Sequence, residues 1–364
     1  MKAIILAGGV GTRLRPLSCT RPKLLFPILN KPLLDRTLER LAETEVDGVI
    51  LAVKFMSEVY IQRYGESKHD IKISYSIEKK PMRTGGAIKF AEELIGNEKP
   101  FLVLNGDILT TIDYSALIKK HKESNAIATI ALYRVEDPSR YGTVKLTDKD
   151  QITQFIEKAP PGKAPSNLIN AGVYVLDPEI FKYIPAGRPV SIEHEVFPKL
   201  AKEKKLFGYE FSEIWIDIGK TEDYLRANRV LLDTEPEKRL IGNDVNIKEG
   251  TKFSDPVRID TGVTIGQNSK IGPYTIIGKG TILGKNVTVE HSVIFPNVTI
   301  EDNASVIASV IGESAKIGAN TRISEGCIVG DYVTIHDDIT ISTNVSICHS
   351  KEVTENVPES KQII

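Results

Sequence analysis

The sequence predicts an α/β protein that begins with a mostly parallel β-sheet and ends in a stack of short strands. Two observations predict this fold class. Short apolar segments alternate with helical patterns over about the first 230 residues, and a period of six residues governs the chain after about Leu240. Strands that alternate with helices form parallel sheets covered on both faces. A period of six suits neither an α-helix nor one long strand, and it predicts short strands joined by tight turns.

The first half of the chain contains four segments with the composition of buried strands. They are Lys2–Leu6, Gly48–Val53, Ile71–Ile77 and Phe101–Leu104. Two segments between them have helical periodicity, Pro32–Thr44 and Gly86–Ile95. This alternation predicts a Rossmann-like, mostly parallel sheet. Ligands of such sheets bind at the carboxyl ends of the strands, where the sequences LAGG and LNGD stand.

The composition restricts the class of protein. A chain of 364 residues predicts two or three domains, and the change of pattern places them at residues 1–233 and 243–364, with a linker at 234–242. The net charge of −1 offers no field for nucleic acid or an anionic membrane. Three cysteines without a CxxC pair indicate reduced thiols, and no stretch approaches the ~20 apolar residues of a membrane span. We therefore expect a cytoplasmic protein without nucleic-acid or membrane partners.

The second half repeats every six residues. Steps of six from Ile247 meet an apolar residue each time as far as Phe295, then slip through Ile300 and Val306, and resume from Ile311 to Ile347. This pattern resembles the hexapeptide-repeat left-handed β-helix, in which three hexapeptides form one triangular coil. Its flat faces and open end suit self-association, and we expect a homo-oligomer, a dimer or larger.

A glycine-rich loop follows the first strand. Gly8, Gly9 and Gly11 suit a backbone that binds phosphate, but a dinucleotide fingerprint would need glycine where Leu14 stands, and no P-loop lysine follows Gly11. What distinguishes the loop is a pair of cations, Arg13 and Lys23, which could neutralise charge on phosphate. The glycines alone would fit a tight turn in a solvated basic loop equally well.

Further motifs follow in order along the chain. They are TGGA at Thr84–Ala87, NGD at Asn105–Asp107, Tyr141-Gly142, Glu157-Lys158, NAGVY at Asn170–Tyr174 and WIDIG at Trp215–Gly219. Together with LAGGVGTRLRPLSCTRPK at Leu6–Lys23, they closely resemble the signature of the sugar-1-phosphate nucleotidyltransferases. In that family a sugar 1-phosphate attacks the α-phosphorus of a nucleoside triphosphate, and pyrophosphate leaves.

The resemblance implies a role for each motif. Arg13, Lys23, Asp107 and Asp217 would be catalytic, and the two aspartates would hold Mg²⁺, which prefers hard oxygen ligands. The nucleotide would contact Leu6, Ala7, Gly8, Gly9, Gly11, Thr12, Arg13, Lys23, Thr84, Gly85, Gly86, Asn105 and Asp107. The sugar phosphate would contact Gly142, Glu157, Lys158, Asn170 and Gly172.

Each of these residues also has a structural interpretation. Asp107 after Asn-Gly could form a turn, Glu157 and Lys158 an exposed ion pair, and Asn170 a loop cap. Trp215 is expected to pack rather than to stack on a base. The order of the motifs favours the functional interpretation.

The base and the sugar are less strongly specified. The appended hexapeptide repeats, with NAGVY and WIDIG, look most similar to mannose-1-phosphate guanylyltransferases, which implies GTP and mannose 1-phosphate. Those enzymes commonly have glycine and an acidic residue where this chain has Arg83 and Lys80. A glucose-1-phosphate uridylyl- or thymidylyltransferase is the alternative. Two others are a bifunctional acetyltransferase, with a base among His291, His336 and His349, and a non-catalytic regulatory paralogue.

Overall fold

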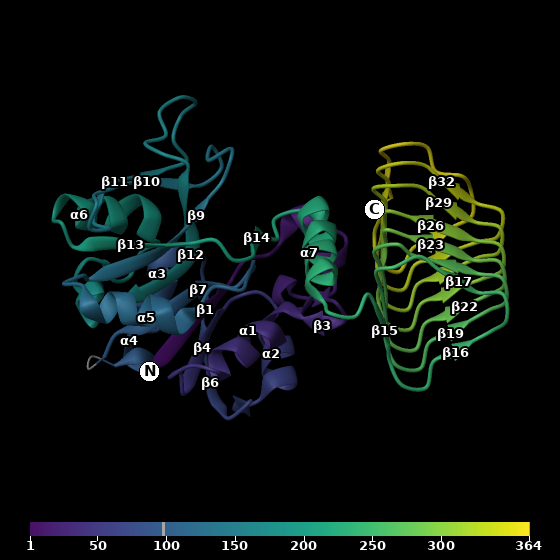
Figure 1. Ribbon diagram of the computed structural model, residues 1–364, viewed down its shortest axis with the longest axis horizontal. Helices are drawn as coiled ribbons and strands as arrows, with labels where there is room; N and C mark the ends of the chain where they lie inside the picture. Colours follow the sequence, from purple (N-terminus) through teal and green to yellow (C-terminus); the bar gives the residue numbers. More distant parts are fainter. Residues whose placement is uncertain (97–98, 364) are drawn as a thin grey trace. The chain divides into compact units, whose positions relative to one another are not determined.

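The computed structural model describes residues 1–96 and 99–363, which fall into two units (Figure 1). The sheet unit comprises residues 1–9 and 34–217, and the β-helix unit comprises residues 10–33 and 218–364. The division does not follow the two halves of the sequence, because residues 10–33, which contain Arg13 and Lys23, belong to the same unit as the hexapeptide repeats.

The sheet unit is built on a ten-stranded sheet whose centre is parallel. Strand β1 (Lys2–Ala7) lies between β4 (Gly48–Val53) and β7 (Phe101–Asn105), parallel to both, and β6 (Ile71–Ile77) continues the parallel order beside β4. Beyond β7 the strand β12 (Leu168–Leu176) runs antiparallel to it. All four strands expected from the sequence are present, in the Rossmann-like arrangement that their alternation with helices predicted.

The remaining strands of the sheet unit extend this sheet or form a small second one. The order is β11-β10-β12-β7-β1-β4-β6-β5, with β9 paired to β12 and β13, and β14 pairs with β8. These strands are β5 (Ser67–Lys68), β8 (Ile108–Thr110), β9 (Ala128–Arg134), β10 (Gly142–Leu146), β11 (Ile152–Glu157), β13 (Leu206–Phe211) and β14 (Trp215–Asp217).

The helices of the sheet unit bury apolar faces against this sheet. They are α1 (Leu33–Ala42), which starts at the unit boundary, α2 (Ser57–Tyr64), α3 (Arg83–Phe90), α4 (Glu92–Ile95), α5 (Tyr114–Glu123), the 3₁₀-helix η4 (Pro178–Lys182), the π-helix η5 (Ile192–Val196) and α6 (Phe197–Lys202). The core joins residues of β1, β7, β9 and β12 to residues of α3 and α6. The single helix predicted over Gly86–Ile95 is wrong in its bounds: it begins at Arg83 and breaks at Ala91, whose amide is shared between two carbonyls, those of Ala87 and Ile88.

The β-helix unit contains three parallel sheets of two- and three-residue strands, one sheet for each side of a left-handed coil (Figure 1). The first sheet consists of β15 (Arg239–Ile241), β18 (Val257–Ile259), β21 (Thr275–Ile277), β24 (Val293–Ile294), β27 (Val310–Ile311), β30 (Ile328–Val329), β33 (Ser346–Ile347) and β35 (Gln362–Ile363). The second consists of β16 (Asn246–Ile247), β19 (Thr264–Ile265), β22 (Ile282–Leu283), β25 (Thr299–Ile300), β28 (Lys316–Ile317), β31 (Thr334–Ile335) and β34 (Glu352–Val353). The third consists of β17 (Lys252–Phe253), β20 (Lys270–Ile271), β23 (Thr288–Glu290), β26 (Ser305–Ile307), β29 (Arg322–Ile323) and β32 (Thr340–Ile341).

The stack begins at Arg239, inside the segment expected to be a linker. The helix α7 (Thr221–Thr234) precedes it, and the segment 10–33 contributes η1 (Thr12–Leu14), η2 (Leu17–Cys19), η3 (Lys23–Leu25), β2 (Pro27–Ile28) and β3 (Lys31–Pro32). The domain boundaries drawn from the sequence stay a prediction.

One residue of the repeat is assigned wrongly by a uniform step of six. Ile294, and not Phe295, stacks between Ile277 and Ile311, so the register slips by one residue before Phe295. Phe295 takes the position held by Gly278 in the coil before it and Gly312 in the coil after it, and it lies outside the inner apolar core although it is fully buried.

Candidate active site

The carboxyl ends of β1 and β7 bring two of the motifs together. Leu6 is paired with Asn105 across the two parallel strands, and the amide of Gly106 donates to the carbonyl of Leu6 at 3.0 Å. Gly8 and Gly9 follow β1, and Gly106 and Asp107 follow β7. The predicted nucleotide-binding residues 6–9 and the NGD motif therefore share one edge of the sheet.

The two candidate metal ligands lie on a small antiparallel ladder. Strand β8 begins directly after Asp107, and Asp217 is the last residue of β14, paired with Ile108 of β8. Both carboxylates are half-buried. Although 110 positions separate them in the sequence, the pairing places Asp217 opposite the residue next to Asp107.

Trp215 connects this ladder to the sugar-phosphate motifs. Its indole Nε1 donates to the carbonyl of Ala171 at 2.8 Å, and its ring contacts Tyr141 edge-on with the centroids 5.4 Å apart. Tyr133 stacks against the same ring at 5.4 Å. Trp215 is 7% exposed, so it packs, as the sequence predicted, and it also fixes β14 against NAGVY.

Gly172 of NAGVY contacts the side chain of Asn105. A Cβ on Gly172 would lie 2.7 Å from Nδ2 of Asn105, and the φ of +73° at Gly172 is one that side chains other than glycine rarely adopt. The Oδ1 atom of Asn105 is buried and has no hydrogen-bond partner among the residues that the structure describes. An unpaired buried acceptor costs free energy, so this amide is suited to receive a ligand donor.

Asn170, by contrast, already uses both ends of its amide. Its Oδ1 accepts from the amide of Gly172 at 2.9 Å, and its Nδ2 donates to the hydroxyl of Tyr174 at 3.0 Å. These bonds match the loop-cap interpretation of Asn170. They also fix the backbone turn at Gly172, so that Asn170 shapes this part of the site whether or not it touches a sugar.

Glu157 and Lys158 are not an ordinary exposed pair. Glu157 is half-buried at the end of β11, opposite Gly142, and its Oε2 would lie 2.5 Å from a Cβ on that glycine. Lys158 has a φ of +50°, an uncommon conformation for a residue with a side chain, and its amide donates to Tyr141 at 3.1 Å. Only glycine at position 142 leaves room for Glu157 where it stands.

The carboxyl group of Glu157 has a raised pKa. Burial is the largest cause, and the negative charge of Glu193 raises the pKa further, while His194 and Lys158 lower it. Protonation of Glu157 is therefore more favourable in the folded protein than in the unfolded chain. As the pH rises above the ordinary pKa of 4.5, the ionised carboxylate increasingly destabilises the folded state.

Replacing Glu157 by glutamine removes this opposition. We expect Glu157→Gln to have a higher Tm than the unmodified protein near neutral pH, with a gain that shrinks as the pH falls toward 4.5. Thermal unfolding followed across that interval measures the effect. Glu136→Gln, at an exposed position, is the control. A difference in Tm that does not depend on pH would contradict the interpretation.

The TGGA motif begins helix α3 and is tied to a residue that sequence reasoning missed. The hydroxyl of Thr84 donates to Oε2 of Glu193 at 2.6 Å and accepts from the amide of Ile192 at 3.1 Å. Ser191 donates to the same carboxylate oxygen at 2.6 Å. Glu193 is therefore hydrogen-bonded to the predicted base-binding helix, and its negative charge raises the pKa of Glu157.

Gly85 and Gly86 explain the close approach of this helix to residues 188–192. A Cβ on Gly86 would lie 3.4 Å from the carbonyl oxygen of Arg188, and one on Gly85 would lie 3.2 Å from the amide of Ile192. Arg83 has a φ of +60°, which glycine adopts without strain. Arg83 adopts this conformation although it carries a side chain.

The β-helix unit carries the other predicted phosphate-binding residues. Gly11 has a φ of +65°, and its carbonyl accepts from the hydroxyl of Ser18 at 2.8 Å and from the amide of Leu14 at 2.9 Å. Thr12 and Arg13 are exposed in the short helix η1 that follows. A Cβ on Gly11 would lie 3.5 Å from Cβ of Lys23, which begins η3 and is 8% exposed, so the two cations belong to one folded-back segment.

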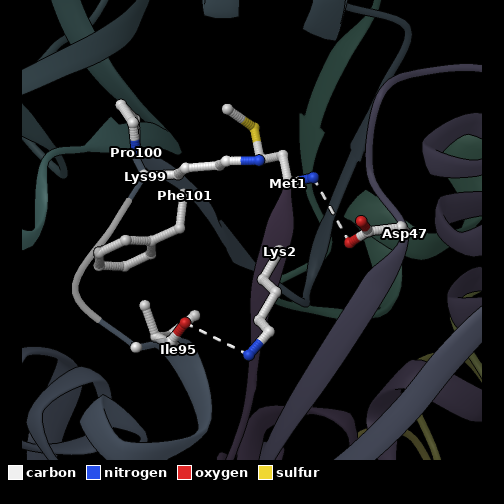
Figure 2. Close-up of a pocket in the computed structure, with 8 residues that line it drawn as sticks. Met1, Lys2, Asp47, Ile95, Lys99, Pro100 and Phe101 are labelled. Atoms are coloured by element: carbon white, nitrogen blue, oxygen red, sulfur yellow. Dashed lines mark hydrogen bonds and ion pairs between the residues drawn. The ribbon is translucent and has the colours of Figure 1, made fainter.

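A cavity of about 380 Å³ lies at the other end of the sheet. It is lined at the amino ends of β1 and β7 by Lys2 and Phe101, beside Met1, Asp47 and Ile95 (Figure 2). The amino group of Met1 is paired with Asp47 at 3.4 Å, and Lys2 donates to the carbonyl of Ile95. None of the predicted site residues lines this cavity.

Residues 1–96 and 99–363 contain no group of three or more His, Cys, Asp or Glu side chains arranged to hold a metal ion, and no helix long and apolar enough to cross a membrane. All three cysteines are free thiols. Cys327 is buried, and Cys19 and Cys348 are partly buried.

A mostly parallel sheet whose strand ends carry glycines, two half-buried aspartates and a half-buried glutamate is typical of α/β enzymes that bind their ligands at that edge. The chain belongs to the nucleotidyl transferase family, whose model matches residues 2–234, and the GMPPB C-terminal domain model matches residues 253–364. The protein is therefore a nucleotidyltransferase with a C-terminal hexapeptide-repeat β-helix, as the resemblance predicted.

Three relatives show how far the similarity extends. Mannose-1-phosphate guanylyltransferase catalytic subunit beta of Danio rerio is 36% identical over 368 residues, which cover 100% of both chains. The structure of HddC from Yersinia pseudotuberculosis complexed with GMP-PN is 30% identical with a TM-score of 0.53, covering 63% of this chain and 99% of HddC. A UDP-glucose pyrophosphorylase complexed with UDP-glucose is 26% identical with a TM-score of 0.57, covering 64% of this chain and 99% of that chain.

Proposed function

We propose that the protein transfers the guanylyl group of GTP to mannose 1-phosphate, forming GDP-mannose and pyrophosphate. The observation that carries this proposal is the similarity to mannose-1-phosphate guanylyltransferase of Danio rerio along the whole chain, the hexapeptide repeats included.

The reaction needs positioning and charge stabilisation rather than a covalent intermediate. The phosphate of mannose 1-phosphate attacks the α-phosphorus of GTP in line, while the bond to the β-phosphate breaks and pyrophosphate leaves. Arg13 would bind the departing pyrophosphate and Lys23 the α-phosphate. Lys158 would bind the phosphate of the sugar, and Glu157 would accept hydrogen bonds from its hydroxyl groups.

A Mg²⁺ ion fits the residues present. Asp107 directly precedes β8, Asp217 ends β14 opposite Ile108, and both carboxylates are half-buried. Mg²⁺ is commonly held by one or two carboxylates together with substrate phosphates. When bound, the ion would neutralise charge on the reacting phosphates. The unpaired Oδ1 of Asn105, at the end of the neighbouring strand β7, supports a polar ligand at the same edge of the sheet.

GTP is favoured over other nucleotides because a relative that is 30% identical was solved with GMP-PN. The alternative is UTP or dTTP with glucose 1-phosphate.

We further propose that the β-helix supports self-association, which light scattering would measure as a mass above 40.2 kDa.

A matrix of substrates tests the proposal. GTP, UTP, dTTP and ATP are each combined with mannose, glucose and N-acetylglucosamine 1-phosphate, and the release of pyrophosphate is measured. We expect kcat/KM for GTP with mannose 1-phosphate to exceed every other pair by about 10²-fold, since sites that hydrogen-bond their substrate reject analogues strongly. Preference for UTP or dTTP with glucose 1-phosphate would favour the alternative, and no reaction with any pair would favour a regulatory paralogue. Acetyl-CoA turnover is the separate test for an acetyltransferase.

A further inference from the structure

Arg21 lies in a nearly buried cluster of charges within the β-helix unit. Its Nη2 atom is 2.7 Å from Oδ2 of Asp331 and 2.8 Å from Oε2 of Glu313, residues of two successive coils. The side chain of Asp331 is only 1% exposed and that of Arg21 16%. The hydroxyl of Thr20 donates to the same Oδ2 atom at 2.5 Å, and the amide of Glu313 donates to Oδ1 at 2.7 Å. One carboxylate therefore joins two coils of the β-helix to the segment 10–33.

Aromatic contacts continue this attachment. The guanidinium of Arg21 lies 4.9 Å from the centroid of Phe295, the residue that replaces a glycine of the repeat and points out of the core. Phe26 lies edge-on to Phe295 at 6.3 Å and to Tyr224 of α7 at 5.8 Å. Further along the segment, Nδ2 of Asn30 donates to the carbonyl of Ile277 at 3.0 Å. The outward Phe295 is buried because the segment covers it.

The attached segment is the one that carries the two cations. Lys23 follows Arg21 by two positions, and the Cβ atom of Lys23 would lie 3.5 Å from a Cβ on Gly11. The hydroxyl of Ser18 holds the carbonyl of Gly11 at 2.8 Å. A displacement of Arg21 would therefore also displace Lys23, which is two residues away along the backbone, and Gly11, which lies close to Lys23. Misplacement of a catalytic group by about 1 Å can cost on the order of 10²-fold in rate.

We infer that Arg21, Glu313 and Asp331 form a clamp by which the β-helix sets the conformation of the phosphate-binding segment, residues 11–26. Arg21 is then a positioning residue, and the β-helix contributes to turnover in addition to any role in assembly. The inference rests on the proposed function for its effect on turnover, but the clamp itself can be measured without substrates.

The test compares Asp331→Asn in the full chain with Asp255→Asn. The control removes an aspartate from the same β-helix that is paired with Arg239 at 2.9 Å but exposed. Asparagine keeps the shape and removes the charge that Arg21 requires. If Asp331→Asn does not fold, Glu313→Gln, at a half-exposed position, weakens the clamp without leaving a buried carboxylate unpaired.

The first measurement is amide hydrogen exchange without ligand. We expect exchange in residues 11–26 to speed up by about tenfold or more in Asp331→Asn, with little change in strands β1 and β7 and none in Asp255→Asn. Unchanged exchange in residues 11–26 would overturn the clamp, whatever the activity.

The second measurement is the kinetic split with GTP and mannose 1-phosphate. We expect kcat to fall by about tenfold or more in Asp331→Asn while the KM for mannose 1-phosphate stays within about twofold, since only the segment with Arg13 and Lys23 is disturbed. Faster exchange with an unchanged kcat would overturn the positioning role. If the unmodified protein turns over no substrate pair, the proposed function fails and the exchange measurement alone decides the clamp.

Discussion

Asp107→Asn is expected to lower turnover by about 10²–10³-fold, because it removes a charge that would balance the charge of two reacting phosphates. The substitution keeps the size and shape of the side chain. The pairing of β8 with β14 is made through the backbone, so the fold should persist, with a Tm close to that of the unmodified protein. Pyrophosphate release at saturating Mg²⁺, together with thermal unfolding, measures both quantities.

Asp150→Asn is a suitable control for this variant. Asp150 is paired with Lys120 at 2.6 Å on the surface, and exposed ion pairs contribute little to stability. Turnover of the control should remain within about twofold of the unmodified protein. Near-normal turnover of Asp107→Asn at saturating Mg²⁺ would remove Asp107 from the proposed metal site.

Gly172→Ala is expected to reduce turnover by about 10–10²-fold, because the new methyl group would displace Asn105. Its Cβ would lie 2.7 Å from Nδ2 of Asn105 and 3.1 Å from Cβ of the same residue, and Asn105 precedes Asp107 by two positions. The positive φ at position 172 adds about 1–2 kcal/mol of backbone strain. Both the strain and the displacement should lower the free energy of unfolding.

Gly162→Ala separates these two effects. Gly162 has nearly the same φ, +72° against +73°, but a Cβ there would meet nothing within 4 Å. We expect this control to lose stability through backbone strain alone and to keep its turnover. If the two alanine variants lost the same stability and the same activity, contact between Gly172 and Asn105 would not matter to the site.

Much of the sheet unit could be predicted because its signals are local. Short β-branched strands such as Gly48–Val53 are recognisable in a few residues, and their alternation with helices restricts the sheet to a parallel centre. The break at Ala91 could not be predicted because Gly86–Ile95 has continuous helical periodicity. In the structure α3 ends where the amide of Ala91 donates to two carbonyls, those of Ala87 and Ile88.

The repeats were recognised from their period, but the position of Phe295 could not be read from it. Ile294 and Phe295 are adjacent apolar residues, and both satisfy a pattern of hydrophobicity in which one step may be five or six residues long. Stacking with Ile277 and Ile311 selects Ile294. An aromatic residue suits position 295 because it contacts Phe26 and Arg21, which lie more than 260 positions earlier in the chain.

The same distinction applies to the candidate site. The motifs NGD and WIDIG have a fixed spelling, and the structure places Asp107 next to β8 and Asp217 on β14, which pairs with β8. Glu193 could not be predicted because its hydrogen-bond partner Thr84 lies 109 positions earlier and no local pattern distinguishes it from other glutamates. Arg21 lies within the signature LAGGVGTRLRPLSCTRPK, but the sequence assigns it no role because its partner Asp331 lies 310 positions later.

The products formed from GTP and mannose 1-phosphate show directly whether this nucleotidyltransferase forms GDP-mannose. The purified protein is incubated with GTP, mannose 1-phosphate and Mg²⁺, and GDP-mannose, pyrophosphate and orthophosphate are quantified together. We predict GDP-mannose and pyrophosphate in equal amounts, with no orthophosphate, because attack at the α-phosphorus releases the β- and γ-phosphates as one group. Orthophosphate as the main product, or no GDP-mannose at all, would contradict guanylyl transfer from GTP to mannose 1-phosphate.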